Sequence, residues 1–375
     1  MKKLLCALIV CVLSISAAYA KGNFKFAVSE DISYDDNIYL TKDDKKSSLI
    51  SSTQLFADYL STFPGTALKF GANANVGYNA YTEEAAKNDY VNAGLGLNLG
   101  NKIFSIDENF LYTADPATSE LTDRAKRINN TAAFRLKTST EKMFSLGFIV
   151  SDIYDKYIDD DYSDLNKNRI NAGLQVHYNL SPKTSVYVGY LFSKITYEKT
   201  DINDSTGNSI NLGVTGNITA KVKGTAQVSY DMRDYDKEKE GADNNPGIMG
   251  YLLSLTYDPT FRDTISLTGE RKMEESSYAN NRYYISTEVG VDYKHEFNSK
   301  WSAGIFAAYE NMAYPRSVDS VKRADDFVKV RPSIGYKFKD NLFASVWYQL
   351  KNKTSNCEFA EYTDNKVGVQ VKYCF

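Results

Sequence analysis

His177 and His295 are the only histidines in the chain and the first residues to consider for catalysis. A hydrolase usually needs a serine or aspartate beside a histidine, because the imidazole takes a proton from the nucleophile or from water. Each histidine precedes a short polar turn, and the alternation described below places His177 on an inward face and His295 on an outward face. Neither position suits a site open to the cell exterior. We therefore expect no enzyme activity and interpret both residues as interfacial histidines.

Acidic residues cluster in three connecting segments, which are potential cation ligands. The clusters are Asp155 with Asp159–Asp161 and Asp164, Asp201 with Asp204, and Asp231 with Asp234 and Asp236. The second is loosely similar to a calcium loop, but Thr206 replaces the required glycine and Leu212 the required glutamate. Glycine-rich phosphate loops and zinc-ligand spacings are absent from the sequence. We expect no metal and no cofactor, and interpret the clusters as solvated loop charge that divalent ions could bridge to lipopolysaccharide.

The segments that position these residues show a two-residue period, most clearly in 66–81. One face carries Leu68, Phe70, Ala72, Ala74, Val76, Tyr78 and Ala80, and the other Lys69, Gly71, Asn73, Asn75, Gly77 and Asn79. This is the period of a β-strand. Strands of soluble domains usually have about five or six residues, whereas a tilted strand that crosses a bilayer needs about nine to eleven. The pattern predicts membrane-spanning strands.

Eighteen segments follow this pattern and predict an all-β fold, a closed antiparallel transmembrane barrel, with sixteen strands as the nearest alternative. They are 23–34, 48–62, 66–81, 90–98, 103–113, 128–138, 143–155, 168–180, 185–197, 208–218, 222–235, 247–258, 264–275, 282–297, 301–314, 325–338, 342–353 and 365–375. Backbone groups in lipid must all be paired. We therefore expect 24–34 to pair with 365–375.

The connections alternate in length, as short periplasmic turns and long outer loops do in such barrels. Short ones are 63–65, 181–184, 219–221, 298–300 and 339–341; long polar ones are 35–47, 114–127, 156–167, 236–246 and 354–364. Proline cannot donate to a sheet ladder. Pro64, Pro116, Pro182, Pro246, Pro259 and Pro315 fall in connections, but Pro332 falls inside a predicted strand. Either that strand has a bulge or its prediction is wrong.

Aromatic residues gather at the predicted strand ends, as interfacial girdles do. The inner rim has Tyr178, Tyr257, Phe297, Tyr336, Phe338, Tyr373 and Phe375, and the outer rim Tyr81, Tyr90, Tyr157, Tyr197, Tyr235, Tyr283 and Tyr314. The alternative is ordinary core tyrosine in a soluble β-protein. Such a fold would need neither the long strands nor the aromatic terminus.

Charged residues at inward positions are the candidates for a functional site. The pore-lining candidates are Arg233, Glu270, Lys272, Glu288, Glu310, Lys329, Arg331 and Lys351. Rings of charge can select ions, but the signs here are mixed, with a basic excess on the last three strands. The alternative is a wetted wall whose charges pair across strands. Tyr187, Phe306 and Trp347 also point inward, where they could stack on sugar or simply fill space.

The two ends of the chain indicate its location. Residues 1–20 have two lysines, an apolar run and Ala18-Tyr19-Ala20, the pattern of a cleaved signal peptide, so 21–375 form the mature barrel domain. The last nine residues alternate and end on Tyr373 and Phe375, similar to the terminal signal by which outer-membrane barrels are assembled. We expect an outer-membrane protein of a Gram-negative-type bacterium, secreted to the periplasm and inserted by the barrel-assembly machinery.

Composition narrows the possible partners. The chain has 44 basic and 47 acidic side chains, a formal charge of −3, which argues against nucleic acid. Cys357 falls in the last outer loop and Cys374 near the opposite rim, too far apart to form a disulfide. The expected partners are outer-membrane lipid, lipopolysaccharide and small polar solutes or oligosaccharides.

The start of the mature chain resembles the putative β-barrel porin 2 family of outer-membrane proteins. In that family a Tyr-Asp-Asp-Asn segment ends the first strand, and a polar stretch leads to a second strand rich in serine and threonine. Here the motif is Tyr34, Asp35, Asp36 and Asn37, followed by Lys42–Lys46 and Ser47–Thr53. The resemblance implies an outer-membrane pore, associated in some members with polysaccharide production or export. It implies no catalytic residues.

Three functions fit these observations. The one we favour is a porin-like channel for passive diffusion of small polar solutes, because a barrel of this size encloses an aqueous channel. The others are an outer-membrane component linked to polysaccharide export and a non-conducting structural or adhesive barrel.

Overall fold

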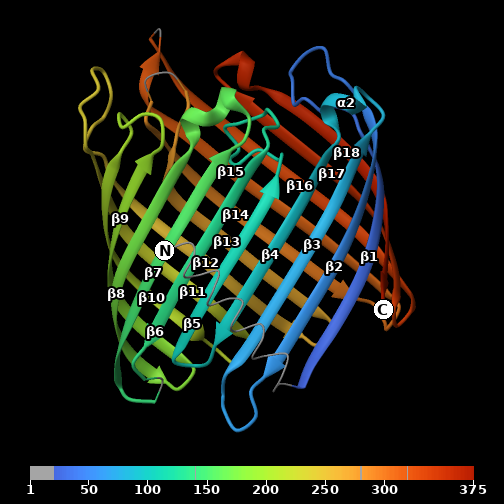
Figure 1. The fold of residues 1–375 in the computed structure, drawn as a ribbon, viewed down its shortest axis with the longest axis vertical. Coiled ribbons are helices and arrows are strands. Elements are labelled where there is room, and N and C mark those ends of the chain that lie inside the picture. The colour runs from blue at the N-terminus through green and yellow to red at the C-terminus, as the bar shows by residue number, and fades with distance from the viewer. Residues whose placement is uncertain (1–20, 140, 279–280, 319) are drawn as a thin grey trace.

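A computed structural model describes residues 21–139, 141–278, 281–318 and 320–375. Eighteen antiparallel strands form one sheet that closes on itself, since β1 (Lys21–Asp35) pairs with both β2 (Ser48–Thr62) and β18 (Tyr362–Cys374). Figure 1 shows the tilted strands around one lumen, with the longer loops at the upper end. The closed eighteen-stranded barrel predicted from the sequence is confirmed.

The remaining strands follow in chain order around the barrel. They are β3 (Lys69–Tyr81), β4 (Tyr90–Gly100), β5 (Phe104–Thr113), β6 (Arg127–Lys137), β7 (Phe144–Tyr157), β8 (Lys167–Ser181), β9 (Thr184–Tyr197), β10 (Ser205–Asn217), β11 (Val222–Tyr235), β12 (Gly247–Thr260), β13 (Asp263–Glu275), β14 (Tyr283–Glu296), β15 (Trp301–Val318), β16 (Val321–Lys339) and β17 (Leu342–Ser355). Short helices in the loops are α2 (Ala85–Asn88), η1 (Asp160–Leu165) and η2 (Glu358–Ala360). The described residues include no helix that is long and apolar enough to cross a membrane.

The predicted pairing of the first strand with the last is confirmed at the seam between β1 and β18. Ala27 lies opposite Cys374 and Asp35 opposite Lys366, with every intervening residue paired. The backbone N–H of Phe375 donates to the carbonyl of Phe26 at 2.8 Å, so the chain end is held in the seam. Cys357 and Cys374 are free, as expected from their separation. The predicted signal peptide lies outside the described residues.

The two faces of the strands differ as the alternation predicts. On β18, Val367, Val369 and Val371 are 44–49% exposed on the outer wall, while Lys366 faces inward beside Asp35. On β3, Val76 and Tyr78 are likewise exposed outward, and Phe70 is the exception, buried beside the ring of Tyr59. The outer wall is therefore apolar, as contact with lipid requires.

Aromatic residues mark the lower rim of the barrel but not the upper rim as predicted. Tyr178, Tyr257, Phe297, Phe338, Tyr373 and Phe375 are exposed on the outer wall. None of the seven tyrosines predicted for the outer rim is exposed: Tyr81, Tyr157, Tyr235, Tyr283 and Tyr314 are buried, and Tyr90 and Tyr197 are half-buried. That prediction is wrong.

Strand parity explains this correction. Tyr81 is three residues from the outward Tyr78, so its side chain leaves the opposite face of β3. The outward tyrosines at this level lie elsewhere, and their hydroxyls donate to polar groups: Tyr78 to Asp89, Tyr154 to Glu198, Tyr190 to Asn208, Tyr309 to Asp326 and Tyr348 to Asn365. These five tyrosines, each with an apolar ring and a polar hydroxyl, have the amphipathic character of residues at a membrane interface.

Three prolines lie inside strands, two of them contrary to prediction. Pro259 and Pro315 belong to β12 and β15, where the ladder shifts register between Tyr257 and Thr260 and between Ala313 and Ser317. A bulge tolerates proline because no ladder hydrogen bond is lost there. Pro332 pairs with Ile305 in β16, and the ladder to β17 is interrupted there without a change of register. The predicted strand is therefore correct and needs no bulge.

Candidate functional site: the lumen and its outer mouth

The eight predicted pore-lining residues all lie on lumen-facing positions of β11 and of β13–β17. Glu270, Glu288 and Glu310 are directly opposite one another on three neighbouring strands and form one acidic row. Lys272 pairs with Glu270 at 2.6 Å, whereas Glu310 accepts hydrogen bonds from two serines. Lys329, Arg331 and Lys351 lie on the next two strands. The charges therefore form an acidic stripe beside a basic one, and neither is a closed ring.

The histidines confirm the two faces of the wall. His177 packs inside against the ring of Tyr187, with Ser185 and Gln175 within hydrogen-bond distance. His295 lies on the outer wall beside Phe297, and its Nδ1 is 2.7 Å from Asp263. Ser185 and His177 are both buried, at 3% and 6% exposure, and the other ring nitrogen of His177 lies beside Gln175 rather than beside a carboxylate. Asp263 lies on the lipid side.

Glu275 connects the upper end of β13 to β8 and β11, which lie five and two strands away around the barrel. Its carboxylate, only 8% exposed, accepts hydrogen bonds from Lys167 and Arg169 of β8 and Arg233 of β11, at 2.7–2.9 Å. Residues beyond Arg271 no longer pair with β12 and keep only the ladder to β14. This freedom lets the β13 end lean over the lumen, where Met273 packs against Tyr235 and Ile248 of the barrel wall. The mouth is narrowed as a result.

The segment between β5 and β6 narrows the mouth further from the other side. Ser119 donates to Glu310 of β15 at 2.6 Å and accepts from Lys353 of β17 through its backbone carbonyl at 2.8 Å. Glu120 accepts hydrogen bonds from Ser276 and Ser277, at the end of β13. These partners are far away in sequence and around the barrel, so the segment 114–126 crosses the lumen.

A buried charge cluster contacts that crossing segment through Lys353. The Arg323 guanidinium lies 2.6 Å from the Asp325 carboxylate, and Lys353 lies 3.3 Å from the same group, with all three side chains at most 3% exposed. The rings of Tyr314 and Tyr278 face the guanidinium at 4.5 and 4.8 Å. Buried charges need such pairing. The cluster gives the segment a rigid base.

The family-motif residues fasten the seam at the outer rim. Asp36 accepts two hydrogen bonds from Asn365, through its backbone and its amide, at 2.7 and 2.8 Å. Asn37, fully buried, donates from Nδ2 to the carbonyls of Thr41 and Thr363 at 2.7 and 2.9 Å. The motif therefore connects the first strand to the last and shapes the first outer loop.

Two aspartates of this motif form an acidic group with Asp364. The carboxylates of Asp35, Asp36 and Asp364 approach within 4.8 Å of one another, a spacing that a cation could bridge. Lys351 lies 3.4 Å from Asp364, and Lys366 lies 3.8 Å from Asp35. The two ammonium groups already neutralise most of this charge.

The first outer loop is also held by an ion pair outside the strands. Lys42 lies 2.8 Å from Glu361 and 3.6 Å from Glu358. The hydrogen bond from Lys42 lowers the pKa of the Glu361 carboxyl, and that same bond raises the pKa of Lys42. The loop is therefore attached to the segment before β18 by charge.

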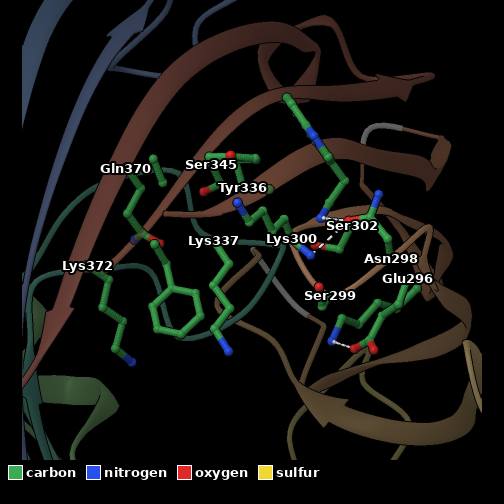
Figure 2. Close-up of a pocket in the computed structure, with 15 residues that line it drawn as sticks. Glu296, Asn298, Ser299, Lys300, Ser302, Tyr336, Lys337, Ser345, Gln370 and Lys372 are labelled. Atoms are coloured by element: carbon green, nitrogen blue, oxygen red, sulfur yellow. Dashed lines mark hydrogen bonds and ion pairs between the residues drawn. The ribbon is translucent and has the colours of Figure 1, made fainter. Parts of the chain in front are cut away.

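Residues of the basic stripe line two open cavities, one bordered by β1–β4 and β16–β18 and the other by β14–β17. The upper one, about 430 Å³, lies under the mouth, and the lower one, about 540 Å³, lies toward the inner rim. Arg331 and Trp347 line both. A third cavity of about 430 Å³ continues to the inner rim, where Lys337 and Lys372 point the same way (Figure 2).

Three of these residues, Lys353, Glu275 and Glu120, are not among those predicted from the sequence. Lys353 has the same parity as Lys351, so alternation alone could have added it. Glu275 has the parity of the outward Leu267, and only the departure of β13 from β12 turns it inward. Glu120 lies in a loop, where no period exists to place it. Their partners are set by tertiary structure alone.

Comparisons with known proteins agree with this architecture. A family model described as putative beta-barrel porin 2 matches residues 21–375. No curated protein is significantly similar to the chain in sequence.

Among solved structures, the fold is similar to Acinetobacter baumannii OccAB4, at 13% identity and a TM-score of 0.51, covering 96% of this chain and 99% of that one. It is also similar to a BenF-like porin from Pseudomonas fluorescens Pf-5, at 10% identity and a TM-score of 0.54, covering 95% and 98%. A third is Pseudomonas aeruginosa OccK2 (OpdF) in complex with glucuronate, at 9% identity and a TM-score of 0.52, covering 95% and 98%. At such identities the likeness concerns the fold.

The closed barrel, its apolar outer wall and the match over all of 21–375 lead to one assignment. The chain belongs to the putative β-barrel porin 2 family and is a porin-like outer-membrane channel.

Proposed function

We propose that the protein carries small polar solutes across the outer membrane by passive diffusion. The observation that supports this most is the closed wall with two different faces, apolar side chains outward and charged or amide side chains inward. Such a lumen is insulated from lipid and filled with water, so a solute can cross without losing its hydration. No residue has to perform chemistry for this function.

The narrowed mouth limits the size of the solutes. The segment 114–126 and the end of β13 both lean over the lumen and are fixed by ion pairs and hydrogen bonds. A small sugar or sugar acid fits this picture better than a polymer. The similar OccK2 structure contains glucuronate, which is compatible with a solute of that size.

Secretion and assembly complete the proposal. The predicted signal peptide, 1–20, would direct the chain to the periplasm, and Tyr373 with Phe375 would be recognised by the barrel-assembly machinery. Phe375 is 78% exposed and its ring lies 4.9 Å from that of Tyr373, so both rings are accessible on the outer wall. The acidic outer loops would face lipopolysaccharide, with divalent ions between them.

Planar-bilayer recording of the purified, refolded barrel tests the proposal. We expect stepwise ionic currents, and in vesicle swelling a faster uptake of monosaccharides than of oligosaccharides. Currents that are blocked by long glycans only would favour polysaccharide export. A correctly folded barrel that gives no current and no uptake would contradict the proposal and favour a structural or adhesive role.

A further inference from the structure

We infer that the lumen contains a binding site for small hydroxylated carboxylates, centred on Lys329 and Arg331 of β16. This inference rests on the proposed function, because the solute must reach the lumen, and it adds the chemical class of the solute. The site lies below the narrowed mouth, on the wall formed by β14–β18.

The first observation is that both cations lack an anionic partner. The Lys329 ammonium faces the ring of Phe306 at 5.6 Å, and the Arg331 guanidinium lies over the ring of Trp347 at 4.2 Å. Within the described part of the chain, neither cation makes an ion pair or a hydrogen bond. Arg135, by contrast, is 2.6 Å from Asp107 on the other side of the lumen.

An aromatic partner leaves such a cation able to bind. The face of a ring stabilises the positive charge and orients it, but it does not neutralise the charge or use the N–H donors in its plane. Arg331 therefore keeps a flat guanidinium whose edge can bind a carboxylate through two hydrogen bonds.

The second observation is an unfavourable pair of like charges. Lys329 lies directly opposite Lys351 across the β16–β17 ladder, and like charges so placed are destabilising. Lys351 has an ion pair with Asp364, at 3.4 Å, whereas Glu288, which forms no ion pair with Lys329, offsets only part of the repulsion at Lys329. A bound carboxylate near Lys329 would relieve this repulsion.

The third observation is the position of Arg331 along the lumen. Arg331 and Trp347 line both the upper and the lower cavity, so a solute that follows this wall passes them. The lower cavity is lined by three basic side chains and one acidic side chain, Asp292. Ser333 and Ser345 also line it, and their hydroxyls could hydrogen-bond the hydroxyls of a solute. Below it, Lys372 continues the positive charge toward the inner rim, whereas Lys337 beside it is paired with Asp340 at 2.7 Å (Figure 2).

Tryptophan fluorescence provides a direct binding assay. The chain has two tryptophans, Trp301 and Trp347, and Trp301 lies on the outer wall at the inner rim. The variant Trp301→Phe therefore leaves Trp347, beneath Arg331, as the single reporter. We expect glucuronate to change its fluorescence saturably and glucose, which lacks the carboxylate, to have no effect.

Two substitutions of equal charge locate the site. Loss of one charge-assisted contact should weaken the apparent affinity for glucuronate roughly tenfold in Arg331→Gln. Arg135→Gln removes the same charge from a lumen position that already has a carboxylate partner, so it should leave the affinity unchanged. Lys329→Gln should weaken binding without disturbing the contact between Arg331 and Trp347.

Reversal potentials in a potassium chloride gradient give the second readout. We expect a preference for chloride that falls in Arg331→Gln and persists in Arg135→Gln. The inference would be overturned if the wild-type channel prefers potassium or if glucuronate does not change the fluorescence. It would also be overturned if Arg135→Gln lowers the affinity for glucuronate or the chloride preference as much as Arg331→Gln does. A protein that binds glucuronate but never conducts would instead overturn the proposed function and leave the site standing.

Discussion

Ala74 offers the sharpest test of which strand face meets lipid. It lies near the middle of β3, outward, with Ala57 and Leu95 as its neighbours across the ladder. Neither neighbour can accept a hydrogen bond from an introduced guanidinium or neutralise it. In Ala74→Arg, the cation must stay in lipid or bend toward an interface, which costs about 2–4 kcal/mol near mid-membrane in barrels of this type.

The matched control places the same side chain one residue away. Asn73 is exposed on the lumen face of the same strand, so Asn73→Arg puts the guanidinium in water at nearly the same depth. Gly71→Leu is a second control, because no atom lies within 4 Å of a Cβ added there. We expect both controls to change the free energy of unfolding by less than about 1 kcal/mol.

Equilibrium unfolding in phospholipid vesicles measures these differences. The barrel is titrated with guanidinium chloride, and unfolding is followed by tryptophan fluorescence. Free energies of unfolding are compared between variants whose unfolding free energy depends on denaturant concentration with the same slope. If Ala74→Arg destabilises the barrel by about 3 kcal/mol, the equilibrium constant for folding falls by roughly two orders of magnitude. The face assignment is refuted if Asn73→Arg destabilises the barrel as much as Ala74→Arg does.

Three further perturbations address the mouth. Glu120→Ala removes the acceptor of three hydrogen bonds that hold the crossing segment, so single-channel conductance should rise; unchanged conductance would show that the segment does not limit flow. Glu275→Ala leaves three partly buried cations without their shared, buried anion and should cost about 3–5 kcal/mol in chemical unfolding. Glu296→Ala removes one exposed partner of Lys294 and should cost clearly less. Because Lys42 lowers the pKa of Glu361, their contact stabilises the first outer loop above the ordinary glutamate pKa and is lost as the pH falls through the lowered value. Hydrogen exchange of residues 38–46 should accelerate accordingly, and Lys42→Gln should abolish that dependence on pH.

The strands were largely predictable because a barrel exposes each of them to lipid and water in the same way. Alternation along 342–353 is enough to place β17 and to turn Trp347 inward, since parity alone decides the face. The same rule fails at the mouth, where the β15–β16 hairpin continues to Val318 and Val321, well beyond the predicted ends. Beyond the membrane both faces of the hairpin meet water, so the alternation of polar and apolar residues no longer indicates where the strands end.

The outer tyrosines show a second limit of sequence reasoning. Position near a strand end predicts an interfacial tyrosine, but parity decides whether it faces lipid or the mouth. Position predicts that Tyr235 and Tyr283 face the membrane interface, yet both pack into one buried cluster with Met273. The contacts that narrow the lumen, such as Glu275 with Arg169, join strands five positions apart around the barrel, and a periodic pattern contains no information about them.

Spin labels along β3 test the central claim most directly. With Cys357 and Cys374 replaced by serine, a nitroxide is placed in turn at each position from Ala72 to Tyr78 in the lipid-embedded barrel. Two relaxing agents are then compared, molecular oxygen, which dissolves in lipid, and a water-soluble nickel complex. We predict that oxygen reaches positions 72, 74, 76 and 78 best and the nickel complex reaches 73, 75 and 77 best. If the accessibility to oxygen and the accessibility to the nickel complex rise and fall together along β3, the result contradicts a wall with lipid on one side and water on the other.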